Sequence, residues 1–291
     1  MSGVLGNHRS FMKMTGSGND FVFFDVRQEP VGNGASRLAE PERVRALCAR
    51  GTGVGADGMV LVKSSPLPGV DAAIAYFNAD GTRATLCGNA TLCTVRFLRT
   101  DGEGPTPAGQ VAIGTDVGVI TGRLREGVPE IDLDAVGALT TDMSMEMALE
   151  PGAGERRIGF VVVGVPHLVV LVDDVDQVDV AGRGAALRRH PSLGASGANV
   201  NFVSQPRVGG RWLVRTFERG VEGETLACGT GIVASASLVA EWGLGASPLS
   251  FLTRSGSVLT VRLASGPAGT GPRPSLSGEG RLVFRGTLED V

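Results

Sequence analysis

Short apolar runs alternate with polar turns along most of this chain. Runs rich in β-branched and aromatic residues, bounded by Gly, Asn or Asp, predict strands, whereas apolar residues three and four apart predict helices. We expect strands on both sides of a Gly-Ser-Gly-Asn-Asp turn at 16–20, and at 60–62, 72–77, 111–113, 117–121, 131–133, 157–163, 168–172, 199–203, 212–217 and 281–288. Helices are expected at 41–50, 87–98 and 229–242, with loops at 102–109 and 266–274. The pattern therefore predicts an α+β protein with many strands.

Two cysteines stand in nearly the same local sequence. Cys87 begins Cys-Gly-Asn-Ala-Thr-Leu-Cys and Cys228 begins Cys-Gly-Thr-Gly-Ile-Val-Ala, each at the start of a predicted apolar helix. A helix N-terminus presents free N–H groups and the positive end of the helix dipole, so it stabilises a thiolate or a bound anion. The repetition predicts a pair of proton-transfer groups that act on one anionic substrate.

Weaker similarity extends beyond the cysteines. Gly-Asn-Asp-Phe-Val at 18–22 resembles Ala-Asn-Val-Asn-Phe-Val at 198–203, which makes Asn19 and Asn199 candidate counterparts. Asn78 lies nine residues before the first cysteine, and Glu218-Arg219 lies ten and nine before the second. We interpret this as a gene duplication that gives two related domains.

Composition narrows the classes of function. The chain has 291 residues, a hydrophobic fraction of 42%, and a formal net charge of -3, which provides no field for nucleic acid or an anionic membrane. The first ten residues lack an apolar segment, and the apolar stretch 158–172 is interrupted by Gly164, Pro166 and His167. These features predict a cytoplasmic protein with no membrane span, whose partner is a small molecule.

The four cysteines are expected to be reduced thiols. The three histidines, at 8, 167 and 190, do not lie near a cysteine pair at the spacing of a zinc site, so no metal is predicted. Cys48 and Cys93 are interpreted as core residues, whereas the glycine-flanked context favours catalysis for Cys87 and Cys228.

Seven motifs in this order resemble the diaminopimelate epimerases, cofactor-independent two-cysteine amino-acid racemases. They are Gly-Ser-Gly-Asn-Asp-Phe (16–21), Gly-Val-Gly-Ala-Asp-Gly (53–58), Phe-Asn-Ala-Asp-Gly (77–81), Leu-Cys-Gly-Asn-Ala (86–90), Gly-Val-Pro-His (164–167), Asn-Val-Asn-Phe-Val (199–203) and Phe-Glu-Arg-Gly-Val-Glu-Gly-Glu-Thr-Leu-Ala-Cys-Gly-Thr-Gly (217–231). The resemblance implies two pseudo-symmetric domains, each a mixed, mostly antiparallel sheet wrapped around a central helix. We expect residues 1–125 with the returning segment 279–291 to form one domain, and 126–278 the other.

The resemblance also implies the reaction, which interconverts LL- and meso-2,6-diaminopimelate for lysine and peptidoglycan precursor synthesis. The resemblance implies that the protein needs no cofactor and no metal, and that it forms a homodimer. Without an electron sink the enzyme must stabilise charge on the α-carboxylate by preorganised N–H donors. The expected catalytic residues are Cys87, Cys228, His167 and Glu218; the expected substrate-binding residues are Asn19, Asn78, Gly88, Asn89, Asn199, Glu218, Arg219, Gly229 and Thr230.

Several features leave alternatives open. Val165 stands where the family often has Asn and cannot supply a side-chain hydrogen bond, which allows a racemase of another amino acid. Ala90 replaces a frequent Gly, and Glu222 is an extra residue in its loop. Proline and hydroxyproline racemases are disfavoured because Leu226-Ala227, not Ser-Pro, precedes the second cysteine. A non-catalytic binding protein or a redox switch is the third alternative. Asp80 and Gly58 are expected to serve turns.

Overall fold

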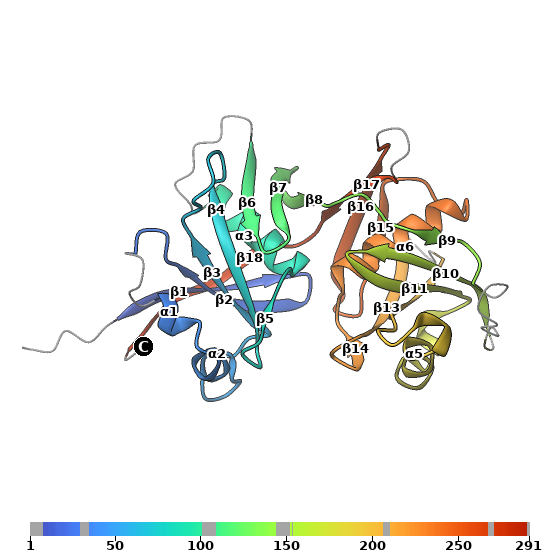
Figure 1. The fold of residues 1–291 in the computed structure, drawn as a ribbon, viewed down its shortest axis with the longest axis horizontal. Coiled ribbons are helices and arrows are strands. Elements are labelled where there is room, and N and C mark those ends of the chain that lie inside the picture. Colours follow the sequence, from blue (N-terminus) through green and yellow to red (C-terminus); the bar gives the residue numbers. More distant parts are fainter. Residues whose placement is uncertain are drawn as a thin grey trace, which may run out of the picture. The chain divides into compact units, whose positions relative to one another are not determined.

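The computed structural model describes residues 8–29, 35–100, 109–143, 152, 154–205, 210–266 and 271–289. The chain divides into two compact units, Met1–Ile131 with Glu279–Val291, and Asp132–Gly278 (Figure 1). The first boundary is predicted after residue 125 and lies after residue 131. The second is predicted after residue 278, where the structure also has it. The predicted loop at 102–109 lies almost entirely outside the described residues, as does the middle of the one at 266–274.

The first unit is a mixed sheet built outward from a hairpin. β1 (Arg9–Gly16) and β2 (Asn19–Asp25) are antiparallel, and β3 (Gly58–Lys63) joins β2 in parallel after α1 (Ala35–Leu38) and α2 (Pro41–Cys48). β4 (Ala72–Asn78) is antiparallel to β3 and carries the short β5 (Arg83–Ala84). β6 (Gln110–Thr115) runs parallel to β4, and β7 (Gly118–Arg125) and β8 (Val128–Asp132) continue the sheet antiparallel. β18 (Arg281–Leu288) pairs with β1, as the red and blue strands of Figure 1 show.

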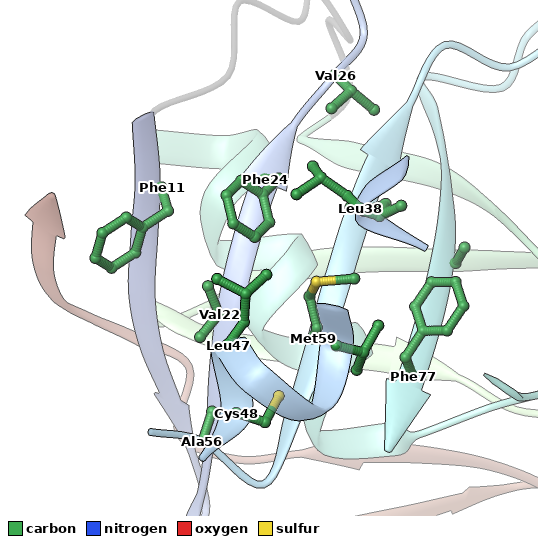
Figure 2. Packing of buried hydrophobic residues seen from close by; sticks show 13 residues of the cluster. Phe11, Val22, Phe24, Val26, Leu38, Leu47, Cys48, Ala56, Met59 and Phe77 are labelled. Atoms are coloured by element: carbon green, nitrogen blue, oxygen red, sulfur yellow. The ribbon is translucent and has the colours of Figure 1, made fainter. Parts of the chain in front are cut away.

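One helix lies on each side of this sheet's core strands. α3 (Gly88–Thr100) packs against β1, β6, β7 and β18 and buries Asn89 through Val95 without interruption. On α2, Leu47 and Cys48 join an apolar cluster with Val22 of β2 and Met59 of β3 (Figure 2). The sheet wrapped around a buried helix, which the family resemblance implies, is confirmed.

The second unit repeats this order of elements. β9 (Leu139–Thr140) pairs with β10 (Glu155–Val163), which forms a hairpin with β11 (Val165–Val172). After α5 (Val180–Arg188), β12 (Asn199–Ser204) joins β11 in parallel, β13 (Trp212–Glu218) is antiparallel to β12, and β14 (Gly223–Thr225) is a short strand on β13. α6 (Gly229–Glu241) follows, then β15 (Leu249–Leu252) parallel to β13, with β16 (Val258–Ala264) and β17 (Arg273–Ser277) antiparallel.

The repeat is therefore a repeat of topology, and it corrects one inferred pair. Asn19 opens β2, whose counterpart in the second unit is β11, whereas Asn199 opens β12, whose counterpart is β3. The two asparagines are not equivalent, because a five-residue likeness between strand starts does not identify which strand each begins. The two cysteine helices, α3 and α6, are equivalent, since each follows the same pair of antiparallel strands.

The sequence pattern misses α5. Its segment contains Gly182 and Gly184, which lower helix propensity. Asp179 offsets this cost by accepting a hydrogen bond from the Gly182 N–H at 2.9 Å as a helix cap. A Cβ at Gly184 would lie 2.6 Å from Phe217 of β13, so the glycine is needed for the helix to pack closely on the sheet. Within the described residues, no helix is long and apolar enough to cross a membrane.

Candidate functional site

Cys87 immediately precedes α3 in the first unit. The Thr91 N–H and the Thr91 hydroxyl both donate to the Cys87 carbonyl at 2.9 Å, which fixes the first turn of the helix. The N–H groups of Gly88 and Asn89 fall in the first turn, where helix geometry provides no intrahelical acceptor. The thiol therefore lies at the positive end of a buried helix, as predicted.

Tyr76 is the side chain that the sequence analysis missed beside Cys87. It lies on β4, directly opposite Ala84 of β5. Burial raises the pKa of the Tyr76 phenol well above its usual value, and the charge of Cys87 and a hydrogen bond between the two side chains raise it further. A Cβ at Gly58 would lie 2.8 Å from the phenol oxygen and 2.6 Å from the Phe77 carbonyl. Gly58 therefore makes room for Tyr76, and its predicted role in a turn is wrong.

Asn19 and Asn89 form a hydrogen-bonded pair near the same helix start. Asn89 Nδ2 donates to Asn19 Oδ1 at 2.8 Å, and Asn19 Nδ2 donates to Asp57 Oδ2 at 3.1 Å. Asn89 is buried, and its Oδ1 has no hydrogen-bond partner among the described residues. The hydrogen bond to Asn19 thus fixes an Asn89 amide whose Oδ1 is unsatisfied, two residues after Cys87. This oxygen is suited to accept a hydrogen bond from an ammonium or N–H group of a ligand.

A cluster of charges fixes this corner of the sheet. Arg50 contacts Asp20 at 2.7 Å and Asp57 at 2.8 Å, while Lys13 pairs with Asp20 at 2.7 Å. Burial raises the pKa of Asp20, but its bonds to Arg50 and Lys13 outweigh that effect and lower it to about 2. The Asp20 carboxylate thus stays ionised, and Asp57, held by the same arginine, anchors the Asn19 amide.

Asn78 lies at the end of β4, in the turn that leads toward Cys87. Its Nδ2 donates to Thr82 Oγ1 at 3.0 Å, and its N–H donates to the Thr82 carbonyl at 2.8 Å. Asp80 Oδ1 accepts from the Thr82 N–H and hydroxyl at 2.8 and 2.6 Å, which confirms Asp80 as a turn former. The Asn78 Oδ1 atom is left available for a ligand by these bonds.

Cys228 occupies the corresponding position in the second unit, as the N-cap residue of α6. Its carbonyl accepts from the Ile232 N–H at 3.0 Å, and the residue is 8% exposed. Thr230 Oγ1 lies 3.6 Å from Cys228 Sγ. Gly229 and Thr230 supply first-turn N–H groups in the same way as Gly88 and Asn89 do in α3.

His167 is completely buried in β11, one strand from Asn199. Parallel pairing places the two residues side by side in register. Burial, together with the positive charge of Arg219, lowers the pKa of His167 to about 3, so the imidazole is neutral at physiological pH. A ring that stays neutral in this range is poorly suited to exchange protons with the thiols, which is one form of the catalytic role that the resemblance implies for His167.

Glu218 and Arg219 end β13 and begin the loop to β14. Asn199 Oδ1 accepts from the Arg219 N–H at 2.8 Å, so Asn199 fixes the backbone at this point. Burial raises the pKa of Glu218. The extra loop residue Glu222 has a left-handed φ of 56° and pairs with Arg188 and Arg189 at 2.8 and 2.7 Å. Two ion pairs therefore hold the extra residue in place.

The remaining predictions concern metals and the other thiols. All four cysteines are free, and Cys48 and Cys93 are buried, which confirms their interpretation as core residues. Burial raises the pKa of Cys48 to about 11 and that of Cys93 well above its ordinary value. In the part of the chain that the structure describes, no three Cys, His, Asp or Glu side chains gather as metal ligands.

Several site residues were not identified from the sequence. Tyr76, Asp57, Asn201 and Thr216 contact predicted site residues or their partners, yet each is an ordinary strand or turn residue in sequence. Asp57 and Asn201 belong to quoted motifs, which was the one signal available. Within each unit, hydrogen bonds join Asn19 to Asn89 and Asn199 to Arg219.

Comparisons with solved structures agree with the fold. Structures with the same fold include a Bacillus anthracis phenazine biosynthesis protein of the PhzF family, with a TM-score of 0.72 and 15% identity, covering 97% of this chain and 99% of that one. A probable proline racemase from Agrobacterium radiobacter K84 gives a TM-score of 0.64 and 18% identity, covering 96% and 92%. At these identities the likeness concerns the fold alone.

Sequence relatives are much nearer. A diaminopimelate epimerase of Gemmatimonas aurantiaca is 48% identical over 96% of this chain and 99% of its own length. One of Aquifex aeolicus is 42% identical over 86% of this chain and 88% of its own length. The diaminopimelate epimerase family model matches residues 11–126 and 159–268, which contain both cysteine helices. The chain therefore belongs to the diaminopimelate epimerase family.

Proposed function

We propose that this protein interconverts LL- and meso-2,6-diaminopimelate without a cofactor, and so supplies lysine and peptidoglycan precursors. One observation carries the proposal beyond family membership. Cys87 and Cys228 are each the residue before the buried helix that follows the same two antiparallel strands, so a duplicated fold presents two thiols in equivalent settings. Inversion at one carbon needs two such groups.

The chemistry follows from the weak acidity of the α-hydrogen. One cysteine, as thiolate, removes this hydrogen as a proton, and the electron pair moves into the α-carboxylate. The other cysteine, as thiol, delivers its proton to the opposite face of the same carbon, and the configuration inverts. The cysteine that began as a thiolate ends as a thiol, and the other ends as a thiolate. The reverse reaction therefore uses the same two groups in exchanged roles.

The other site residues are assigned to binding and to tuning. The N–H groups of Gly88, Asn89, Gly229 and Thr230 at the two helix starts stabilise the negative charge that builds on the α-carboxylate. Arg219 provides a fork for the distal carboxylate, and Asn19, Asn78, Asn199 and Glu218 bind the remaining polar groups. Glu218 and His167 also tune the thiols, Glu218 because burial keeps its carboxyl closer to the protonated state.

The test is incubation of the reduced protein in D2O with LL-diaminopimelate, with α-deuterium and meso product followed by NMR. Wild type should give both, and Cys87→Ser and Cys228→Ser should each lose epimerisation by at least about 10²-fold. Cys48→Ala is the matched control, because it removes a buried thiol that the proposed mechanism does not use. Folded, reduced wild type that yields neither signal would refute the substrate assignment. A panel of other amino acids then tests whether Val165 has changed the specificity, and no turnover of any would favour a redox or binding role.

We further propose that the enzyme is a cytoplasmic homodimer that needs no metal. Sedimentation equilibrium of the reduced protein should give twice the chain mass. The epimerase activity should be the same with and without EDTA. A monomer that is fully active would contradict the dimer.

A further inference from the structure

The orientation of the buried Asn201 side chain is fixed by its neighbours. Asn201 lies on β12 and is completely buried. Its Nδ2 donates to the Leu168 carbonyl at 3.0 Å, and its Oδ1 accepts from the Thr216 hydroxyl at 3.0 Å. A backbone carbonyl can only accept, so the nitrogen of the amide must be on that side.

The same nitrogen determines the protonation of His167. Asn201 Nδ2 lies 3.2 Å from His167 Nδ1, and the amide nitrogen has a second N–H that can be donated to that ring atom. An N–H donor requires an unprotonated acceptor, so Nδ1 carries no hydrogen and the proton of the neutral ring resides on Nε2. The amide therefore selects one tautomer of the buried imidazole.

Packing makes this amide a tight fit. α6 approaches β12 so closely that a Cβ at Gly231 would lie 2.2 Å from Asn201 Oδ1. Gly231 is the third residue of the helix that Cys228 caps. The Asn201 amide thus spans from the start of the cysteine helix to His167, and it has little freedom to rotate.

The other end of the ring has no such partner. His167 Nε2 is buried and makes no hydrogen bond to any of the described residues. Leaving a buried donor unsatisfied costs about 1–3 kcal/mol, so folding retains it against a penalty. Arg219 contributes a positive potential at the same ring. Its guanidinium forms no ion pair within the described part of the chain. An unsatisfied N–H beside a positive charge is suited to an anionic acceptor.

We propose that Asn201 is a positioning residue that holds His167 as a neutral imidazole, with its Nε2–H aimed at a carboxylate oxygen of the bound amino acid. This inference rests on the proposed function for its ligand. His167 then acts as a fixed hydrogen-bond donor, whose contribution grows as charge builds on that carboxylate, and it does not exchange protons with the thiols.

The tautomer can be tested without any substrate. Protein labelled with ¹⁵N-histidine is examined by long-range ¹H–¹⁵N NMR at pH 7, and the His167 signals are identified by their absence in His167→Gln. We expect Nδ1 to be unprotonated and Nε2 to carry a slowly exchanging proton. A protonated Nδ1 in the free protein would overturn the inference and leave the proposed epimerase activity unaffected.

Kinetics test the consequence for catalysis. Asn201→Asp replaces the donor to Nδ1 by an acceptor, so the ring should adopt the Nδ1–H tautomer and kcat should fall about 10²- to 10³-fold, as on loss of one preorganised donor. KM should change far less, because the lost interaction strengthens mainly in the transition state. Ser204→Ala, a buried change farther along β12, is the control for general disturbance of that strand. Well-folded Asn201→Asp with wild-type kcat would refute the positioning role.

A second variant separates donation from proton exchange. Gln carries an N–H near the position of His Nε2 but cannot titrate, whereas Leu has neither property. His167→Gln should therefore retain at least about tenfold more activity than His167→Leu. Equal loss in both would contradict a donor role, while circular dichroism confirms that each variant is folded. If Asn201→Asp does not fold, this pair and the wild-type tautomer decide the question.

Discussion

Burial of a neutral His167 should make the second unit sensitive to acid. The ordinary pKa of 6.5 falls to about 3 in the folded protein because burial, with help from Arg219, disfavours the charged ring. Between these values the unfolded chain binds a proton that the folded chain does not. Stability contributed by the neutral ring is thus present above pH 6.5 and is lost as the pH falls toward 3.

The magnitude follows from the two pKa values. Their difference, multiplied by about 1.4 kcal/mol per pH unit, gives about 5 kcal/mol for complete loss below pH 3. At pH 5 the unfolded ring is almost fully protonated and the folded ring is not, so about 2 kcal/mol has been lost relative to pH 7.5. This is a large part of the total stability of an ordinary domain.

Tryptophan fluorescence can report on the second unit alone, because both tryptophans of the chain lie in it. Trp212 and Trp242 are buried, so their fluorescence during urea unfolding reports on that unit. Wild type should lose about 2 kcal/mol more than His167→Gln between pH 7.5 and pH 5, because the other titrating groups cancel in the difference.

His190→Gln is the matched control, since it removes a histidine of the same unit that is only partly buried. The loss of stability of this variant between the two pH values shows what removal of a partly buried histidine does in the same assay. If wild type and His167→Gln lose stability in parallel, the claim that folding holds His167 neutral is refuted, and with it the reason for regarding the ring as a donor.

Three further predictions address separate features. Tyr76→Phe removes a hydrogen bond to Cys87 that stabilises its thiolate, and should move the acid limb of the kcat/KM pH profile upward by about 0.7 pH unit, equivalent to ~1 kcal/mol; an unmoved limb would exclude Tyr76 from tuning the thiol. Gly231→Ala places a methyl group 2.2 Å from Asn201 Oδ1 and should lower the free energy of unfolding by about 1–3 kcal/mol in urea titrations, whereas an unchanged midpoint would show that the helix start can relax. Glu130→Gln removes the buried carboxylate that pairs with Arg123 and Arg125, and should lower the free energy of unfolding by about 1–3 kcal/mol. Thermal unfolding followed by circular dichroism measures this loss, and an unchanged Tm would mean that the two ion pairs do not stabilise the fold.

Most of the elements could be predicted from local pattern. Apolar spacing and capping signals are properties of neighbouring residues, so α2, α3, α6 and strands such as β18 lie close to their predicted ranges. One helix that the pattern does not predict, α5, depends on a cap at Asp179 and on close packing of Gly184 against Phe217, and such a contact between distant segments leaves no periodic signal.

The sequence by itself determined the family, through ordered motifs, and the two helix starts that carry Cys87 and Cys228, because Cys-Gly before an apolar run is a local signal. Only the tertiary structure decided which strands correspond in the two units, and it separated Asn19 from Asn199. It alone placed the Tyr76 phenol beside Cys87 and the Asn201 amide against His167. The physical reason is that hydrogen-bond direction and desolvation are set by groups brought together across strands, and these act at distances in sequence over which no residue pattern persists.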